Sequence, residues 1–191
     1  MKSLALNILD IVQNSLRAEA DEINISISEL ESTDQYRIAI EDNGKGIDPG
    51  MLSKVTDPFV TTRTKRRMGM GLPLLKHHAT IAGGNMEIVS EAGKGTRVSS
   101  YFQNSHIDRQ PLGDIAGVTR ILIAANPGVN FTLSFRTDKG EYSFASKDVK
   151  EYLDIETFND ASLLEDIVLM INENLAQINV SGFDTSGINQ E

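Results

Sequence analysis

A short polar stretch that follows an apolar run holds the residues best suited to bind a ligand. Residues 42–48 read Asp-Asn-Gly-Lys-Gly-Ile-Asp, and the apolar residues 36–41 before them predict a buried strand. Two glycines after a strand predict a sharp turn, because glycine tolerates positive φ at little cost. Such a turn places the carboxylate of Asp42 at a cavity edge, where it can accept a hydrogen bond from an exocyclic amine such as that of adenine. The alternative is an ordinary hairpin turn.

The first segment, residues 3–18, predicts a helix with an apolar face and a separate polar face. Asp10, Asn14 and Arg17 share the polar face, since residues three and four apart are neighbours on a helix. A solvated polar stripe is the plain interpretation. The functional interpretation is that Asn14 offers an amide oxygen to a Mg²⁺ ion beside phosphates without adding negative charge.

Two further segments have the composition of a phosphate site. Residues 55–68 lack any period and are rich in threonine, lysine and arginine, which predicts a loop that folds over phosphates or, alternatively, an exposed basic loop. Residues 69–72, Gly-Met-Gly-Leu, precede a predicted helix over 73–82, and glycines at a helix start leave N–H groups that can hold phosphate. The pattern is not a dinucleotide-binding fingerprint, because the third glycine is absent and a loop precedes it.

Composition excludes several classes of protein. The 191 residues include no cysteine and three histidines, which rules out disulfides and thiolate metal sites and argues against a zinc or iron centre. The N-terminus does not resemble a signal peptide, and no apolar run is long enough to span a bilayer. We therefore expect a cytoplasmic protein that does not bind membranes.

The charge is divided unevenly along the chain. Residues 1–104 hold 12 Lys and Arg against 13 Asp and Glu, whereas residues 105–191 hold 6 against 14. An acidic second half argues against binding to nucleic acid or to anionic membranes.

Four motifs stand in a fixed order: the helix with Asn14, the turn at 42–46, the turn at 69–72, and the Gly-Thr pair at 95–96. Together they resemble the GHKL ATP-binding domains of DNA gyrase, the heat-shock chaperone of the same fold, the MutL mismatch-repair ATPase and sensor histidine kinases. Histidine kinases are the most similar, through Asp-Pro-Phe at 57–59 and Thr-Thr-Arg at 61–63. The resemblance implies an α+β fold, a two-layer α/β sandwich of the Bergerat (histidine kinase-like ATPase) type, that binds ATP and Mg²⁺.

The resemblance also implies roles for individual residues. Asn14 would ligate Mg²⁺, and Asp42 would accept a hydrogen bond from the adenine amine. Asp10 stands where the ATPase branches of the family carry a general-base Glu, and its side chain is one methylene shorter. The other residues expected to contact the nucleotide are Arg17, Ala18, Gly44, Gly46, Ile47, Thr62, Arg63, Lys65, Gly69, Met70, Gly71, Leu72 and Thr96.

The chain departs from histidine kinases in its first residues. Those kinases carry a helical dimerisation segment with a phosphorylatable His before this domain, whereas here the chain begins at the nucleotide-binding helix. We therefore expect a stand-alone ATP-binding domain over 1–104. Residues 105–112 share Ser, His, Arg, Pro and Leu with the phospho-acceptor box, but Ile107 replaces its acidic residue. His106 is accordingly interpreted as part of a structured linker over 105–117, with phospho-acceptor as the alternative.

The second half predicts a small α+β domain over 118–177. Strands are expected at 118–125, 131–137 and 141–146, followed by helices at 148–152 and 160–177, so that the extension is a βββα unit. Residues 178–191 are expected to form a loose tail.

Two functions of different classes follow from these expectations. The first is a kinase that transfers the γ-phosphoryl group of ATP to a separate protein in signalling. The second is an ATP-gated binding module with little or no turnover. In both, the acidic C-terminal part would contact a protein partner or regulate the ATP-binding domain.

Overall fold

Alternating apolar and polar residues build the central hairpin of the sheet, β1 (Glu22–Leu30) and β2 (Gln35–Asp42). Ile23, Ile25 and Ile27 are buried, whereas the residues between them, Asn24 and Ser26, are exposed. The two strands pair antiparallel, and a single 3₁₀ turn, η1 (Glu31–Thr33), joins them. The computed structural model describes residues 3–52 and 71–184.

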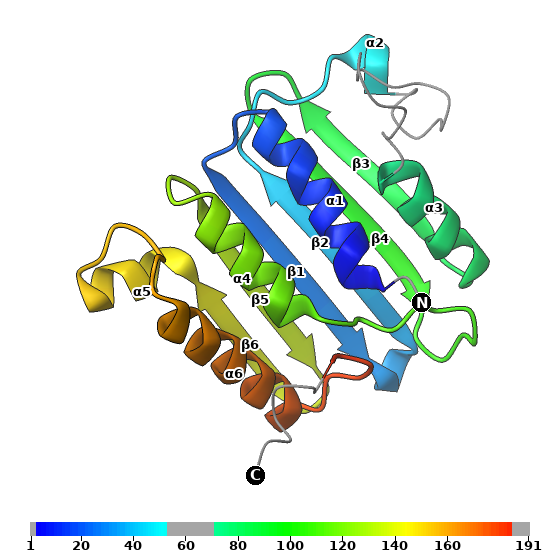
Figure 1. Cartoon of the computed structure of the whole chain (residues 1–191). Coiled ribbons are helices and arrows are strands. Elements are labelled where there is room, and N and C mark those ends of the chain that lie inside the picture. Colours follow the sequence, from blue (N-terminus) through cyan, green and yellow to red (C-terminus); the bar gives the residue numbers. More distant parts are fainter. Residues whose placement is uncertain (1–2, 53–70, 185–191) are drawn as a thin grey trace.

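Four more strands extend this hairpin into a mixed six-stranded sheet (Figure 1). The order is β3-β4-β2-β1-β5-β6, in which only β1 and β5 pair in parallel. The added strands are β3 (Asn85–Glu91), β4 (Gly95–Gln103), β5 (Asn130–Thr137) and β6 (Gly140–Ala145).

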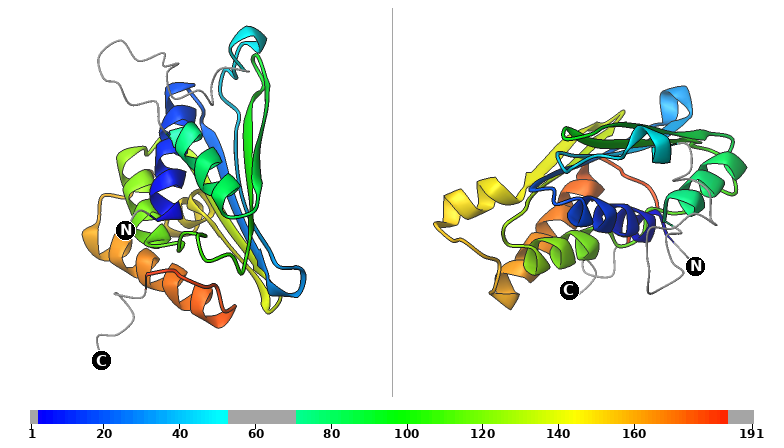
Figure 2. Two further views of the ribbon diagram at one scale, coloured as in Figure 1. Left: turned by 90° about the vertical axis from the view of Figure 1, so that its right-hand side faces the viewer. Right: turned by 90° about the horizontal axis from the view of Figure 1, so that it is seen from above.

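Helices cover one face of the sheet, and the other face carries no helix in the described chain (Figure 2). The helix layer runs in the order α3-α1-α4-α6, since α1 packs beside α3 and α4, and α4 packs beside α6. The predicted two-layer α/β sandwich is thereby confirmed. The helices are α1 (Leu4–Arg17), α2 (Pro49–Leu52), α3 (Gly71–Ile81), α4 (Ile115–Ala125), α5 (Ser146–Leu153) and α6 (Ala161–Gln177).

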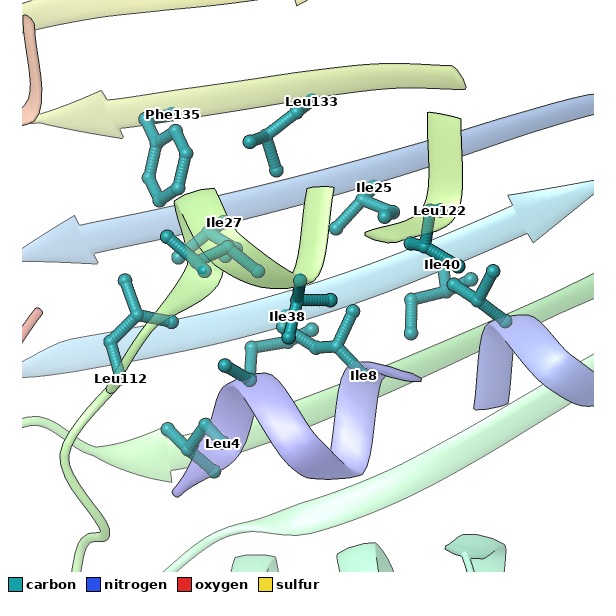
Figure 3. Close-up of a cluster of buried hydrophobic side chains, with 14 of the residues drawn as sticks. Leu4, Ile8, Ile25, Ile27, Ile38, Ile40, Leu112, Leu122, Leu133 and Phe135 are labelled. Carbon is teal, nitrogen blue, oxygen red and sulfur yellow. The ribbon is translucent and has the colours of Figure 1, made fainter. Parts of the chain in front are cut away.

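The apolar core lies between the sheet and the helix layer (Figure 3). Leu4 and Ile8 of α1 point toward the strands, and neither side chain is exposed to solvent. Burial of such a side chain contributes roughly 1.5–3 kcal/mol relative to exposure, so this face fixes α1 on the sheet. The polar residues of α1 are consequently held in a defined place.

The predicted strand over 118–125 is wrong, because this segment belongs to helix α4. Asp114 caps the helix, and its Oδ1 accepts a hydrogen bond from the backbone N–H of Gly117 at 2.7 Å. The helix buries residues on several sides, among them Val118, Leu122 and Ile123. A short apolar run of this kind is compatible with a buried strand or a buried helix, and the period alone does not distinguish them.

Residues 118–177, predicted as a separate small domain, share one sheet with residues 1–104. β5 pairs along its whole length with β1, so residues 118–177 contribute two strands to the same sheet. The predicted βββα extension is therefore two strands with helices α4, α5 and α6, and the expected boundary at 105–117 marks no break in the sheet.

Residues 105–117 and 178–184 pack against the sheet and α1. The backbone N–H groups of Leu4 and Ala5 donate to the carbonyls of Pro111 and Leu112 at 3.0 and 2.9 Å. Val180 is buried, so the expected loose tail is wrong for residues 178–184, and residues 185–191 lie outside the described residues.

A buried carboxylate anchors this C-terminal segment. Glu29 accepts hydrogen bonds from the backbone N–H of Ser181, at 2.8 Å, and from its hydroxyl. The Arg109 guanidinium lies 3.9 Å from the same carboxylate and stacks on the ring of Tyr36. At the same end of the sheet, hydrogen bonds from Gln103 and Ser105 hold the pKa of Asp34 below its usual value.

Candidate nucleotide site

The carboxylate of Asp42 is held at the C-terminal end of β2 by two hydrogen bonds. Ser15 of α1 donates its hydroxyl to Oδ2 at 2.6 Å, and the backbone N–H of Gly44 donates to Oδ1 at 3.0 Å. Asp42 is 9% exposed, so it is nearly but not fully enclosed. Each carboxylate oxygen has two acceptor positions, so one position on each oxygen is left for a ligand. The expected acceptor of an exocyclic amine is therefore preorganised.

The turn after Asp42 is fixed on both sides by backbone contacts. Lys45 N–H donates to the carbonyl of Ala18 at 2.8 Å, which joins the turn to the end of α1. Gly46 has φ +70°, and a Cβ at this position would lie 2.3 Å from the carbonyl oxygen of Glu91. Any other residue would be strained there, which gives the physical reason for a glycine at this position.

Asn43 fixes the same turn to the start of β1. Its Oδ1 accepts from the backbone N–H groups of Asp21 and Glu22 at 3.1 and 3.0 Å, and its Nδ2 donates to the Asp21 carboxylate at 2.6 Å. The two residues of the Asp-Asn pair are therefore held differently: Ser15 and Gly44 orient the Asp42 carboxylate, whereas Asn43 ties the backbone of the turn to the start of β1.

The C-terminal half of α1 presents the polar residues predicted from sequence. Asp10, Asn14 and Arg17 are exposed, and Arg17 Nη1 donates to Asn14 Oδ1 at 3.0 Å. Because the adjacent Ser15 contacts Asp42 and the neighbouring Ala18 contacts the turn, this part of α1 lies beside the Asp42 carboxylate. The structure thus brings the amide and the carboxylate of the predicted site to one end of the sheet.

Thr96 lies opposite Asp42 in the β2–β4 register. Its hydroxyl is 2.9 Å from that of Ser90, and Ser90 Oγ accepts from the backbone N–H of Ile47 at 2.8 Å. These contacts connect the predicted residues Thr96 and Ile47 through a serine on β3. Both predicted residues are half-buried beside the turn.

The start of α3 completes the described part of the site. Gly71 is buried, and a Cβ on it would lie 2.9 Å from Cβ of Asp10, so α3 begins against α1 at this residue. Leu72 packs on the core. The expected phosphate-loop residues Thr62, Arg63, Lys65, Gly69 and Met70 lie outside the described residues.

Comparison with known proteins identifies the kind of domain. Residues 2–106 match the model of the family described as histidine kinase-, DNA gyrase B- and HSP90-like ATPases. The chain belongs to this ATPase family. The match includes Asn14, Asp42, Gly71 and Thr96, and it confirms a histidine kinase-like ATPase domain.

Sensor kinases are among the similar proteins. The alginate biosynthesis sensor protein KinB of Pseudomonas aeruginosa is 33% identical over 89 residues, which are 46% of this chain and 15% of that protein. Sporulation kinase D of Bacillus subtilis (strain 168) is 35% identical over 94 residues, which are 48% of this chain and 18% of that protein. The chain thus spans less than a fifth of the length of these relatives.

A solved structure supports the fold alone. The N-terminal domain of a DNA repair protein superposes with a TM-score of 0.50 at 18% identity, over 76% of this chain and 52% of that one. In the described residues, 3–52 and 71–184, no helix is long and apolar enough to cross a membrane. The same residues hold no cluster of three or more histidine and acidic side chains that could bind a metal ion by itself.

His106 lies at the far end of the sheet from this site. Its backbone N–H donates to the carbonyl of Gln103, the last residue of β4. Thr96, in contrast, is the second residue of that strand. Thr96 and Gln103 are seven positions apart along β4, which is about 23 Å at the usual rise of a β-strand. The His106 imidazole is therefore remote from the Asp42 carboxylate within one chain.

Sequence reasoning missed three residues that organise the site: Ser15, Asn43 and Ser90. Each is a small polar residue whose partner lies far along the chain or on another element. Ser15 is the clearest case, because it follows Asn14 directly and a buried serine in a helix has no signature of its own in a sequence.

Proposed function

We propose that the chain binds Mg²⁺–ATP at this site and transfers the γ-phosphoryl group to a separate protein in signalling. The observation that carries the proposal is the hydrogen-bonded Asp42 carboxylate, which retains acceptor positions beside the amide-bearing end of α1, in a domain of the histidine kinase-like ATPase family. A flat amine-bearing base is complementary to such an acceptor.

Each group in the proposed complex has a distinct duty. Asp42 would accept the adenine amine, with Gly44, Gly46, Ile47 and Thr96 around the base. Asn14 would release its oxygen from Arg17 and contribute one ligand to Mg²⁺, with phosphates and waters supplying the others.

The bound ion would neutralise phosphate oxygens, and the protein would contribute positioning. The proposed contacts on the phosphate side are Thr62, Arg63, Lys65 and residues 69–72, and Arg17 and Ala18 would line the pocket beside Asn14. A histidine nitrogen or serine oxygen of the partner would form a bond to the γ-phosphorus as the bond to the bridging oxygen breaks. The partner group would lose its proton, and ADP would leave with the electron pair.

The second candidate is an ATP-gated binding module with little turnover. Asp10 is exposed on α1, and its carboxylate is one methylene shorter than the general-base Glu of the ATPase branches, so activation of a water is disfavoured in both candidates and the residue does not separate them. In this case ATP would change the affinity for the partner, which the acidic C-terminal part would contact.

Incubation with γ-labelled ATP distinguishes the two functions. The full chain is incubated alone and with a lysate of its source organism, and the label is followed to protein, to inorganic phosphate or to intact ATP. Label on a second protein that disappears with an Asp42→Asn variant is the result expected for the kinase. Bound ATP that remains intact under both conditions would contradict it and support the gated module.

A further inference from the structure

Helices α5 and α6 lie at the β6 edge of the molecule (Figure 1). An apolar groove runs between them. The cavity measures about 440 Å³. We refer to it as the α5–α6 groove. Six apolar or aromatic residues line it, together with Asp148 and Asp166: Val149, Tyr152, Leu153, Leu163, Ile167 and Met170.

Large side chains of this groove are exposed to solvent. The exposed fraction is 89% for Tyr152, 41% for Leu153 and 38% for Met170. Single exposed apolar residues are ordinary on a protein surface, but a contiguous set around a hollow is characteristic of a binding surface. The set lies outside residues 2–106, the part that matches the ATPase family.

The charge around the groove is strongly acidic. Residues 146–177 contain eight Asp and Glu and only two lysines. Both lysines have partners: Lys147 lies 3.8 Å from Glu151, and Lys150 donates to the carbonyl of Pro127. Among the described residues, the two carboxylates that line the groove make no ion pair. An occupant therefore needs apolar groups for the floor and cations for the rim.

We infer that the α5–α6 groove binds an amphipathic helix of a partner protein, with apolar residues flanked by Lys or Arg. A groove between two helices accepts a third through residues at i, i+3, i+4 and i+7. This inference rests on the proposed function, because that function requires a protein partner. It adds the place on this chain where the partner docks and the chemistry of the docking segment.

Charge excludes two other occupants. A second copy using the same surface would bring Asp148 and Asp166 of both copies together, and like charges at an interface oppose association. Residues 185–191 of this chain contain no lysine or arginine and end in Glu191, so they lack the cations that the rim requires.

A synthetic peptide tests the inference directly. The probe is a helix of about 18 residues with leucines at i, i+3, i+4 and i+7, lysines on the other face and one tryptophan. Because the chain has no tryptophan, the probe's fluorescence reports binding to the full chain without interference. A second peptide replaces every lysine with glutamate. We expect saturable binding of the lysine peptide and none of the glutamate peptide.

Variants at exposed positions locate the binding. Tyr152→Ser and Met170→Gln should each weaken the lysine peptide by about tenfold or more, as expected for apolar anchors of an interface. Ile107→Ser is the matched control, since Ile107 is 95% exposed and outside the groove. The double variant Asp148→Asn, Asp166→Asn should weaken binding and reduce its dependence on salt.

Three results would overturn the inference: equal affinity of the groove variants and the control, equal binding of the glutamate peptide, or a concentration-dependent dimer that Met170→Gln abolishes. ATP binding is measured by calorimetry on the same samples. Failure of ATP to bind the wild-type chain would refute the proposed function while leaving the groove result intact. Loss of peptide binding in Tyr152→Ser and Met170→Gln, with ATP binding unchanged, supports the α5–α6 groove as the docking site.

Discussion

Replacement of Asp42 with asparagine should separate recognition of the adenine from recognition of the phosphates. Asparagine has the same shape, and its remaining oxygen can still accept from Gly44 N–H while its amide donates to the Ser15 hydroxyl. The fold is thus preserved. What disappears is the second acceptor oxygen, and an N–H₂ group takes its place beside the adenine amine.

The magnitude follows from the bond that is lost. A hydrogen bond to a charged group contributes about 1.5–3 kcal/mol, which corresponds to a loss in affinity of about 10- to 150-fold. The new amide donor faces another donor, so the loss is expected at the upper end of this range. Inorganic triphosphate, which has no amine, should bind the variant and the wild type equally.

Isothermal calorimetry with Mg²⁺ and either ATP or triphosphate gives both affinities. Asp138→Asn is the matched control, because the Asp138 carboxylate also accepts from one hydroxyl and one backbone N–H, both of Ser32, in the turn before β6. It should leave both affinities unchanged. Equal losses for ATP and triphosphate in Asp42→Asn, or no loss of ATP affinity, would refute the assignment of Asp42 to the base.

The remaining predictions concern the metal, the turn and acid stability. Asn14→Ala should abolish the Mg²⁺ dependence of ATP binding by calorimetry, whereas Asn24→Ala, an exposed asparagine on β1, should not; a retained dependence contradicts the metal role. Gly46→Ala should lower the melting temperature far more than Gly93→Ala. Both glycines have positive φ, which costs alanine about 1 kcal/mol, but only at Gly46 would the new Cβ meet a backbone carbonyl, that of Glu91. Equal shifts in melting temperature would show that the chain relieves the contact with this carbonyl. Because the folded protein lowers the pKa of Asp34 below its ordinary value of 3.8, the ionised carboxylate stabilises the fold at pH values above 3.8, and this stabilisation is lost as the pH falls further. Asp34→Asn should therefore reduce the fall in melting temperature between about pH 5 and 3. An unchanged dependence of the melting temperature on pH would contradict this role.

The fold of the first half could be predicted because its signals are local. β1 alternates residue by residue, α1 has an apolar stripe at helical spacing, and glycines mark the turns. The prediction of a strand over residues 118–125 failed for a physical reason. It is buried on several sides, so it lacks the one-sided pattern that separates helix from strand, and its signal lay in the Asp114 cap upstream.

The sequence indicates which residues of the candidate site have side chains suited to a nucleotide, but it does not indicate the residues that hold those side chains in place. Asp42 and Asn14 have side chains suited to a nucleotide, so their types are informative. Ser15 and Ser90 act through partners 27 and 43 residues away, and serine is common in every kind of segment. The position of β5 beside β1 in the sheet likewise could not be predicted from the sequence, because the paired residues are more than a hundred positions apart.

Hydrogen exchange with and without a non-hydrolysable ATP analogue and Mg²⁺ tests most directly whether separate segments form a single nucleotide site. Amide protection is measured by mass spectrometry across the full chain. We predict joint protection of residues 10–18, 43–47 and 90–96, with no change in 146–177, and loss of all three effects in Asp42→Asn at an analogue concentration that half-saturates the wild type. Protection confined to one of these segments, or located in another part of the chain, would contradict the account.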